Sequence, residues 1–383
     1  MTDRLQSWSA RFLALVMAVA VSVMFIPRPW INPSLFQIGL LLLAMVWAIA
    51  MVVRPFELHF SLPMIPLACA ALWGLLQLAA GWTAGRADTR AAVLVWVANL
   101  LAFALSRQVS DAPLVRRQFL DTLVCFAFVL AVVSVMRLFP ASDPDAMGPF
   151  VNRDQFAAFI EMVLPLALVR ALGGDSRAAG FAIMAAALYA SVIAGASRAG
   201  ALLATAEIVM VPLTMWVKAR RQRNIVRPAA VSIWVLALVF VAVVGWAVLW
   251  GRFQDPDPLR GRREMLADTI GMIHARPWAG FGLGTFRTVY PAYASVDFGS
   301  VVNHAHNDWA EWSADGGIFF GVLLLWIAIW SVPKAVRTVW GIGVVAVFVH
   351  ATVDFPLQKP VLELWLFALL GAMAAESMSI DQR

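Results

Sequence analysis

Apolar runs of about 20 residues recur along the whole chain, and they constrain its fold more than any other feature. A run of this length is what an α-helix needs to cross the hydrocarbon core of a bilayer. Of the 383 residues, 62% are hydrophobic and 14% are charged, whereas a soluble domain has about 45–50% apolar and about 25% charged residues. Because the runs leave no room for a sizeable soluble domain, the sequence predicts one polytopic, all-α integral membrane domain over residues 1–383.

Polar or proline-containing breaks divide the sequence into about twelve predicted transmembrane helices. These cover residues 11–27, 35–53, 61–80, 91–106, 118–138, 155–172, 178–196, 199–217, 229–249, 309–332, 337–353 and 361–377. The first resembles a signal peptide but lacks a small-residue cleavage site, so we interpret it as the first helix. Between helices 9 and 10 lies one long loop, residues 250–307, in which residues 262–275 have the spacing of an amphipathic surface helix.

Lysine and arginine residues indicate how the helices are oriented. With the N-terminus in the cytoplasm, most of them fall in cytoplasmic segments, and the cluster KARRQR at residues 218–223 is the strongest example. By the positive-inside rule, both termini are predicted to be cytoplasmic and the 250–307 loop periplasmic. The net charge of +6 has the same explanation, so no nucleic-acid partner is predicted. Cys69 and Cys125 lie inside apolar runs, where free cysteine acts as a small hydrophobe.

The positive-inside rule does not explain the arginines on the predicted outer face. Arg198 lies in the short turn ASRAG between two apolar runs, where its side chain could simply extend to the bilayer interface. Arg260, Arg262 and Arg263 lie close together in the segment LRGRREML. Because guanidinium groups pair bidentately with phosphate oxygens, these arginines predict an anionic ligand or contacts with acidic lipid headgroups.

Three glycines alternate with larger residues in RPWAGFGLGTF, at Gly280, Gly282 and Gly284. A nucleotide-binding loop would lie between a strand and a helix, and the sequence predicts neither at this place. Glycine allows the backbone to approach a neighbour closely. We therefore expect this segment to pack tightly against helices or to approach a ligand.

The segment HAHNDWAEW, residues 304–312, is polar and precedes an apolar run. His304, His306, Asp308 and Glu311 could ligate zinc, although the usual zinc spacings are absent. Imidazole exchanges protons near neutral pH, so a histidine here is better suited to take a proton from an acceptor hydroxyl. Asp308, Glu311 and Asp315 recur at helical spacing and share a face. This face lines either a functional cavity or the wet top of a helix.

Four segments together resemble the O-antigen ligase and polymerase superfamily of bacterial envelope proteins. In chain order they are GPFVNRDQFAAFIEMVLPLAL, ASRAG, RREMLADTIGMIHARPWAGFGLGTF and HAHNDWAEWSADGGIFFG. The positions that match the family's glycine-rich and His-Asn patterns are Pro277, Gly280, Gly282, Gly284, Phe286, His306, Asn307, Asp315 and Gly317. The chain departs from the family at Leu266, where tryptophan is usual, and at Asp154, where asparagine is common.

The resemblance implies a metal-independent glycosyltransferase without a cofactor in the bacterial inner membrane. Such proteins transfer a glycan from undecaprenyl diphosphate to an acceptor hydroxyl, on another glycan or on lipid A-core, at the periplasmic face among membrane lipids. The product is lipopolysaccharide O-antigen or an exopolysaccharide. The residues to which the resemblance assigns roles are His306 as the base; Arg198, Arg262 and Arg263 as candidate diphosphate ligands; and Asn307, Glu311, Asp315, Gly280, Gly282 and Gly284 as supporting residues.

Two other functions stay open on the sequence. The same superfamily includes proteins assigned to inorganic-carbon transport, and a transporter would place polar residues near the bilayer centre and interrupt helices in matched halves; the sequence shows neither clearly. A protein O-glycosyltransferase would use the same donor with a side-chain acceptor. Ligase and polymerase differ in the acceptor, which no motif in the chain encodes.

Overall fold

A computed structural model describes residues 3–26, 31–138, 147–174, 176–221, 239, 241, 246–257, 259 and 261–381. The regular secondary structure in these residues is helical, apart from one isolated bridge between Met147 and Phe150. The elements are α1 (Asp3–Ser22), η1 (Val23–Phe25), α2 (Ile31–Val53), α3 (Met64–Ala80), α4 (Arg86–Val109), α5 (Pro113–Leu138), α6 (Arg153–Leu172), α7 (Ala178–Gly195), α8 (Arg198–Arg221), α10 (Ala247–Phe253), α11 (Arg262–Ala275), α12 (Phe286–Val289), η2 (Tyr290–Ala292), α13 (Asp308–Gly316), α14 (Ile318–Thr338), α15 (Ile342–His350), η3 (Pro356–Gln358) and α16 (Pro360–Asp381). The all-helical prediction is confirmed for the described residues.

Nine of the described helices are long and apolar enough to cross a membrane, fewer than the predicted count. The run 309–332 forms two helices, α13 and α14, because Gly317 between them has φ 80° and ψ 170°. Within 337–353 the helical residues are Arg337 and Thr338, which end α14, and the nine residues of α15. α15 is about 14 Å long and the 17 residues of α3 reach about 26 Å, and both lengths are short of the roughly 30 Å hydrocarbon core. The predicted span 229–249 lies mainly outside the described residues.

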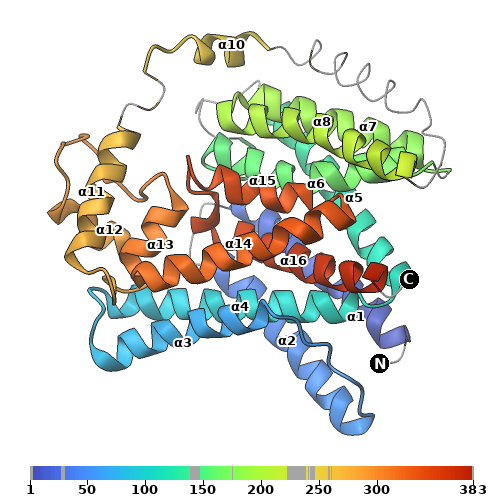
Figure 1. Cartoon of the computed structure of the whole chain (residues 1–383), viewed down its shortest axis with the longest axis horizontal. Helices are drawn as coiled ribbons and strands as arrows, with labels where there is room; N and C mark the ends of the chain where they lie inside the picture. Colours follow the sequence, from blue (N-terminus) through green and yellow to red (C-terminus); the bar gives the residue numbers. More distant parts are fainter. Residues whose placement is uncertain are drawn as a thin grey trace.

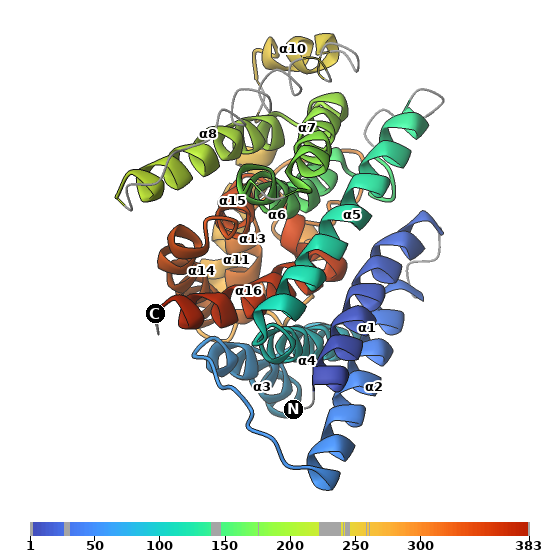
Figure 2. The same ribbon diagram turned by 90° about the vertical axis from the view of Figure 1, so that its right-hand side faces the viewer.

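The helices form one bundle with two distinct ends. α11, α12 and α13 gather at one end, and both chain termini lie at the other (Figure 1). In the view turned by 90°, α6, α15 and α16 lie in the middle, with α7 and α8 on one side and α3 and α4 on the other (Figure 2). The helices α11 and α12 and the chain termini therefore lie at opposite ends of the bundle. Which end faces the cytoplasm stays a prediction.

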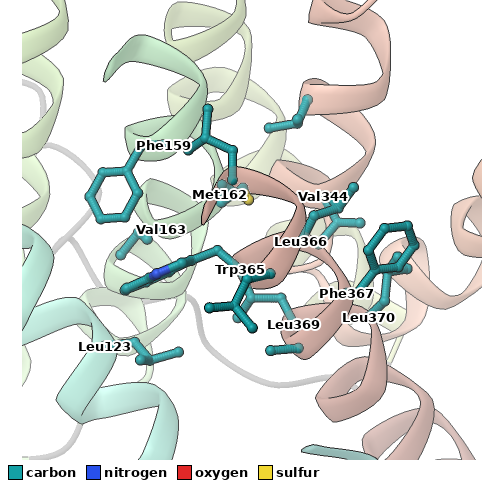
Figure 3. Close-up of a cluster of buried hydrophobic side chains, with 14 of the residues drawn as sticks. Leu123, Phe159, Met162, Val163, Val344, Trp365, Leu366, Phe367, Leu369 and Leu370 are labelled. Carbon is teal, nitrogen blue, oxygen red and sulfur yellow. The ribbon is translucent and has the colours of Figure 1, made fainter. Parts of the chain in front are cut away.

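α6 and α16 lie at the centre of the bundle, and 83% and 89% of their apolar spans are buried. Trp365 of α16 is fully buried against α6 (Figure 3), where its ring lies 4.8 Å from that of Phe159. Its indole Nε1 donates to Met17 O of α1 at 3.1 Å. Gly371 lets α16 approach α4 closely, because a Cβ there would lie 2.3 Å from Phe103 O. Small residues of this kind allow helices to pack where lipid is as apolar as the side chains.

The helix predicted at residues 262–275 is α11, and its bounds are confirmed. Met265 and Ile273 pack against a small cluster of buried residues that includes Met272 and Phe286, whereas Ile270 is exposed. α11 therefore has one face on the protein, and its place at a membrane surface stays a prediction.

Candidate active site

A cavity of about 1090 Å³ lies at the end of the bundle where α11, α12 and α13 gather. It is large enough for part of a drug-sized or oligosaccharide ligand. α4, the first turn of α6, α11, the glycine-rich segment, α13 and the segment before α16 contribute to its wall. The charged residues in the wall are Arg153, Arg252, Arg262, Arg287, Lys359, Asp88, Asp154, Glu311, Asp315 and Glu363, with His304 and His306. This density of charge sets the cavity apart from the apolar bundle.

His306 lies in the cavity wall with its ring against a buried carboxylate. Its Nδ1 lies 3.2 Å from Asp354 Oδ1, and the ring meets that of Phe355 edge-on, 4.6 Å between centroids. Burial raises the pKa of Asp354, but hydrogen bonding with His306 and the charge of Arg262 outweigh burial and hold this pKa below its usual range. The ionised carboxylate only accepts, so the proton of a neutral His306 ring resides on Nδ1 and Nε2 can accept another.

The backbone holds His306 in an uncommon conformation. Its φ is 52°, in the left-handed region that residues other than glycine rarely adopt. Asn307 beside it is the N-cap of α13, where its side chain accepts from Ala310 N at 2.9 Å and donates to Thr352 O at 2.7 Å. The amide of Asn307 therefore fixes the turn that carries His306, as an N-cap residue does.

Arg262 bridges two carboxylates in the cavity wall. Its Nη2 lies 3.0 Å from Asp354 Oδ2 and 3.3 Å from Asp154 Oδ2, and its Nη1 donates to Val353 O at 2.9 Å. Asp154 also accepts from Ser197 Oγ. Arg262 thus ties α11 to the first turn of α6 and to the segment before α16, and an anionic ligand would compete with two aspartates for its guanidinium.

The other predicted arginines do not belong to the residues that line the cavity. Arg198 donates to Arg252 O at 3.2 Å and lies 3.6 Å from Asp255 Oδ2, so it stands behind Arg252, which does line the cavity. The Arg263 side chain is 64% exposed and pairs with Asp257 Oδ1 at 2.7 Å. Of the two adjacent arginines, Arg262 is therefore the one that faces the site. Arg260 lies outside the described residues.

His304 and Glu311 face the cavity as a pair. His304 Nδ1 lies 2.9 Å from Glu311 Oε1, and Glu311 Oε2 accepts from Ala305 N at 2.7 Å. Asp308, by contrast, accepts from Leu357 N at 2.9 Å and is fully buried away from them. The four residues of the zinc alternative are thus not gathered into one metal group within the described ranges.

A second histidine is buried behind Asp354. His350 Nδ1 lies 2.8 Å from Glu161 Oε1, and neither side chain is exposed. Asp154, His350 and Asp354 carry potential ligand atoms within 4.8 Å of one another, so these three side chains could hold a metal ion. Arg262 already donates to both aspartates. A metal ion would therefore share its carboxylates with a guanidinium.

The glycine-rich segment packs against α13 and α3, as its spacing predicted. Gly282 N donates to Asp315 O, and Gly284 N to Asp315 Oδ2, both at 2.9 Å. Gln77 of α3 accepts from Leu283 N at 3.0 Å. Gly284 and Asp315 line the cavity, so this packing forms one side of the site.

Replacing Gly282 with alanine is expected to destabilise this side of the site. Its φ is 112°, and a Cβ would lie 2.3 Å from Thr83 Oγ1 and 2.9 Å from Thr83 Cα. Backbone strain and overlap of this kind cost on the order of 1–3 kcal/mol each. Thermal unfolding of the purified variant followed by tryptophan fluorescence should show a clearly lower midpoint. Gly271→Ala is the matched control: a Cβ at that helical position meets nothing within 4 Å and should be tolerated.

Two carboxyl groups of α13 are buried without full hydrogen bonding. Asp308 Oδ1 and Asp315 Oδ1 have no hydrogen-bond partner in the part of the chain that the structure describes. Burial raises the pKa of both groups well above the usual range of aspartate. We therefore expect both carboxyl groups to keep their protons to a higher pH in the folded protein than in the unfolded chain.

This leads to a pH dependence of stability that Asp315→Asn should reduce. A raised folded-state pKa means that the folded state holds more protons than the unfolded state above the ordinary aspartate pKa, so stability falls as pH rises towards the folded pKa. Asparagine cannot ionise and can still accept from Gly284 N. Unfolding midpoints measured from pH 4 upwards should fall less steeply in Asp315→Asn than in the wild type. An unchanged slope would show that this carboxyl is ionised in the folded state.

Of the predicted site residues, the structure brings five to the cavity wall, namely His306, Arg262, Glu311, Asp315 and Gly284. The residues Arg198, Arg263, Asn307, Gly280 and Gly282 stand outside the wall. Sequence reasoning missed Asp354 as the partner of His306 and gave Lys359 no role in the site. Both fall in VDFPLQKP, between two apolar runs on the predicted outer side. Charged residues in such a short outer turn were the available signal.

Comparison with known proteins adds an independent finding. Residues 179–325 match the family described as O-Antigen ligase, while no curated protein matches the chain. The matched region begins in α7 and ends in α14, so it includes Arg262, the glycine-rich segment and His306. The long apolar helices indicate a multi-pass membrane protein. The chain matches the O-antigen ligase family over residues 179–325, which confirms its resemblance to the O-antigen ligase and polymerase superfamily.

Proposed function

We propose that the protein transfers a glycan from undecaprenyl diphosphate to an acceptor hydroxyl on the periplasmic face of the inner membrane. The observation that carries this proposal is the cavity wall in which Arg262 and the His306–Asp354 pair stand side by side. This wall holds a base with an orienting carboxylate next to a guanidinium. A glycosyl transfer to a hydroxyl from a diphosphate leaving group needs these two functions.

The step itself follows from this arrangement. The acceptor hydroxyl loses its proton to His306 Nε2 as its oxygen forms a bond to the anomeric carbon of the donor. The bond between that carbon and the diphosphate oxygen breaks, and its electron pair leaves with the diphosphate. Arg262, with Arg153 and Arg252 in the same wall, stabilises the negative charge that develops on the leaving group. Arg198 acts by supporting the backbone of Arg252.

The test is transfer by the purified protein in proteoliposomes. The donor is an undecaprenyl diphosphate-linked oligosaccharide, and three acceptors are compared: lipid A-core, a second donor molecule and a serine-containing peptide. Labelled lipid A-core identifies a ligase, a lengthened lipid-linked glycan identifies a polymerase, and a labelled peptide identifies a protein glycosyltransferase. Absence of transfer to all three would contradict the proposal.

One observation favours ion transport as a second candidate. Glu161, His350 and Glu207 are buried inside the bundle, and the Glu207 carboxylate has no hydrogen-bond partner among the described residues. Along the axis of α8, Glu207 lies about 14 Å from the first residue of the helix. The sequence did not clearly show polar residues of this kind inside the bundle. Ionisable residues inside membrane spans often mark ion pathways. Uptake of bicarbonate or protons by proteoliposomes without lipid-linked sugar would support this candidate.

A further inference from the structure

The Lys359 side chain differs in its ion pairing from the three arginines named as candidate diphosphate ligands. Arg198, Arg262 and Arg263 each have a carboxylate within 4 Å. Lys359 lines the cavity, yet its ammonium group makes no hydrogen bond or ion pair with any residue that the structure describes. Its Nζ lies 5.9 Å from the centre of the Phe355 ring. An ammonium group in the wall of a polar cavity therefore remains available to a ligand.

Phe355 places Lys359 beside the proposed base. His306 meets the Phe355 ring edge-on with 4.6 Å between centroids, and His304 stacks on it at 4.5 Å. Burial lowers the pKa of Lys359, although the charge of Glu311 counteracts this. A lowered lysine pKa means that the ammonium form lacks part of the solvation it has in water. A bound anion would restore that stabilisation.

The surroundings of Lys359 contain further unpaired polar atoms. Gln358 Nε2 and Gln155 Oε1 are buried and have no hydrogen-bond partner within the described ranges, and both residues belong to the cavity wall. Lys359 also directly precedes α16 and lies near η3, which packs against α6. The N-termini of α6 and α16 add positive electrostatic potential on this side of the cavity. A cation next to the unpaired NH₂ of Gln358 indicates an anionic ligand, and the unpaired oxygen of Gln155 elsewhere in the wall can accept from a hydroxyl of that ligand.

We propose that Lys359, with the side-chain amide NH₂ of Gln358, binds an oxyanion of the substrate. This oxyanion is either the diphosphate of the lipid-linked donor or a phosphate or carboxylate on an acidic acceptor sugar. The choice between these two sources rests on the proposed function. The ion pair itself does not, because it can be measured without any transfer reaction.

Binding of two anionic probes to the protein in nanodiscs tests this site. The probes are undecaprenyl diphosphate and a short oligogalacturonate, and their neutral counterparts are undecaprenol and a neutral oligosaccharide of equal length. Lys359→Met should weaken the binding of one anionic probe by about tenfold to a hundredfold, the range for loss of a charge-assisted hydrogen bond. Lys359→Arg should bind that probe within about threefold of the wild type. Lys334→Met, which changes a lysine near the far end of α14, is the control.

The outcomes separate the source of the oxyanion from the existence of the site. Weaker binding of undecaprenyl diphosphate, with a raised KM for the donor, assigns the site to the donor. Weaker binding of oligogalacturonate, with a raised KM for an acidic acceptor, assigns it to the acceptor. Wild-type protein that binds neither probe more tightly than its neutral counterpart, or Lys359→Met that binds both as the wild type does, would overturn the proposal. A wild type that binds a probe but transfers no glycan would refute the proposed function alone.

Discussion

Replacing His306 with alanine is expected to lower the turnover of glycan transfer by about 10²- to 10⁴-fold, the usual contribution of a positioned general base. In the proposed reaction His306 Nε2 accepts the proton of the acceptor hydroxyl, because Nδ1 is engaged with Asp354. Without the imidazole, the hydroxyl must lose its proton to water in the cavity. Donor binding does not depend on this nitrogen, so the KM for the lipid-linked donor should change little.

The measurement compares initial rates of the wild type and His306→Ala in proteoliposomes at saturating donor. His274→Ala is the matched control, since His274 is an exposed histidine of α11 that does not line the cavity. Its rate should equal that of the wild type. Unfolding midpoints of both variants establish that they fold. A folded His306→Ala protein with a rate within about threefold of the wild type would exclude His306 as the base.

The general fold could be predicted from the sequence because its signals are local. A run of about 20 apolar residues implies a spanning helix wherever it occurs, and the spacing of α11 gave its bounds without knowledge of its neighbours. The break at Gly317 is different. Gly317 has a φ of 80°, and a Cβ there would lie 2.2 Å from Trp278 O, so contact with a distant segment leaves room only for glycine. Counting apolar residues could not detect it, so α13 and α14 were merged into one span.

The candidate site shows the same limit more strongly. His306, the glycines and the arginines were found because they stand in short motifs. Asp354, in contrast, contacts His306 and Arg262, which are 48 and 92 positions away in the sequence. No local pattern encodes either contact. Lys359 received no role in the site, because a single lysine in a short turn is by default a marker of topology. The role proposed for it rests on the cavity, where its ammonium group has no carboxylate partner among the described residues.

Replacing Asp354 with asparagine is expected to reduce turnover nearly as much as loss of His306, by about 10²- to 10⁴-fold. Asparagine can turn its amide NH₂ towards Nδ1 of His306 and stabilise the imidazole tautomer that carries its proton on Nε2, which cannot act as a base. Arg262 also loses one of its two carboxylate partners. Asp354 thus acts through His306 and Arg262 as a positioning residue, and the KM for the donor should change far less than kcat.

A double-mutant cycle distinguishes this role from a general loss of structure. If Asp354 acts through His306, then adding Asp354→Asn to His306→Ala should lower the rate little further, because residues that act as a unit are strongly non-additive. Asp297→Asn, the same change in an exposed loop residue, serves as the matched control and should leave the rate unchanged. Independent, multiplicative losses from the two substitutions would contradict a shared role. Such losses would assign Asp354 to the fold around α11 and α6, where its ion pair with Arg262 would be its main contribution.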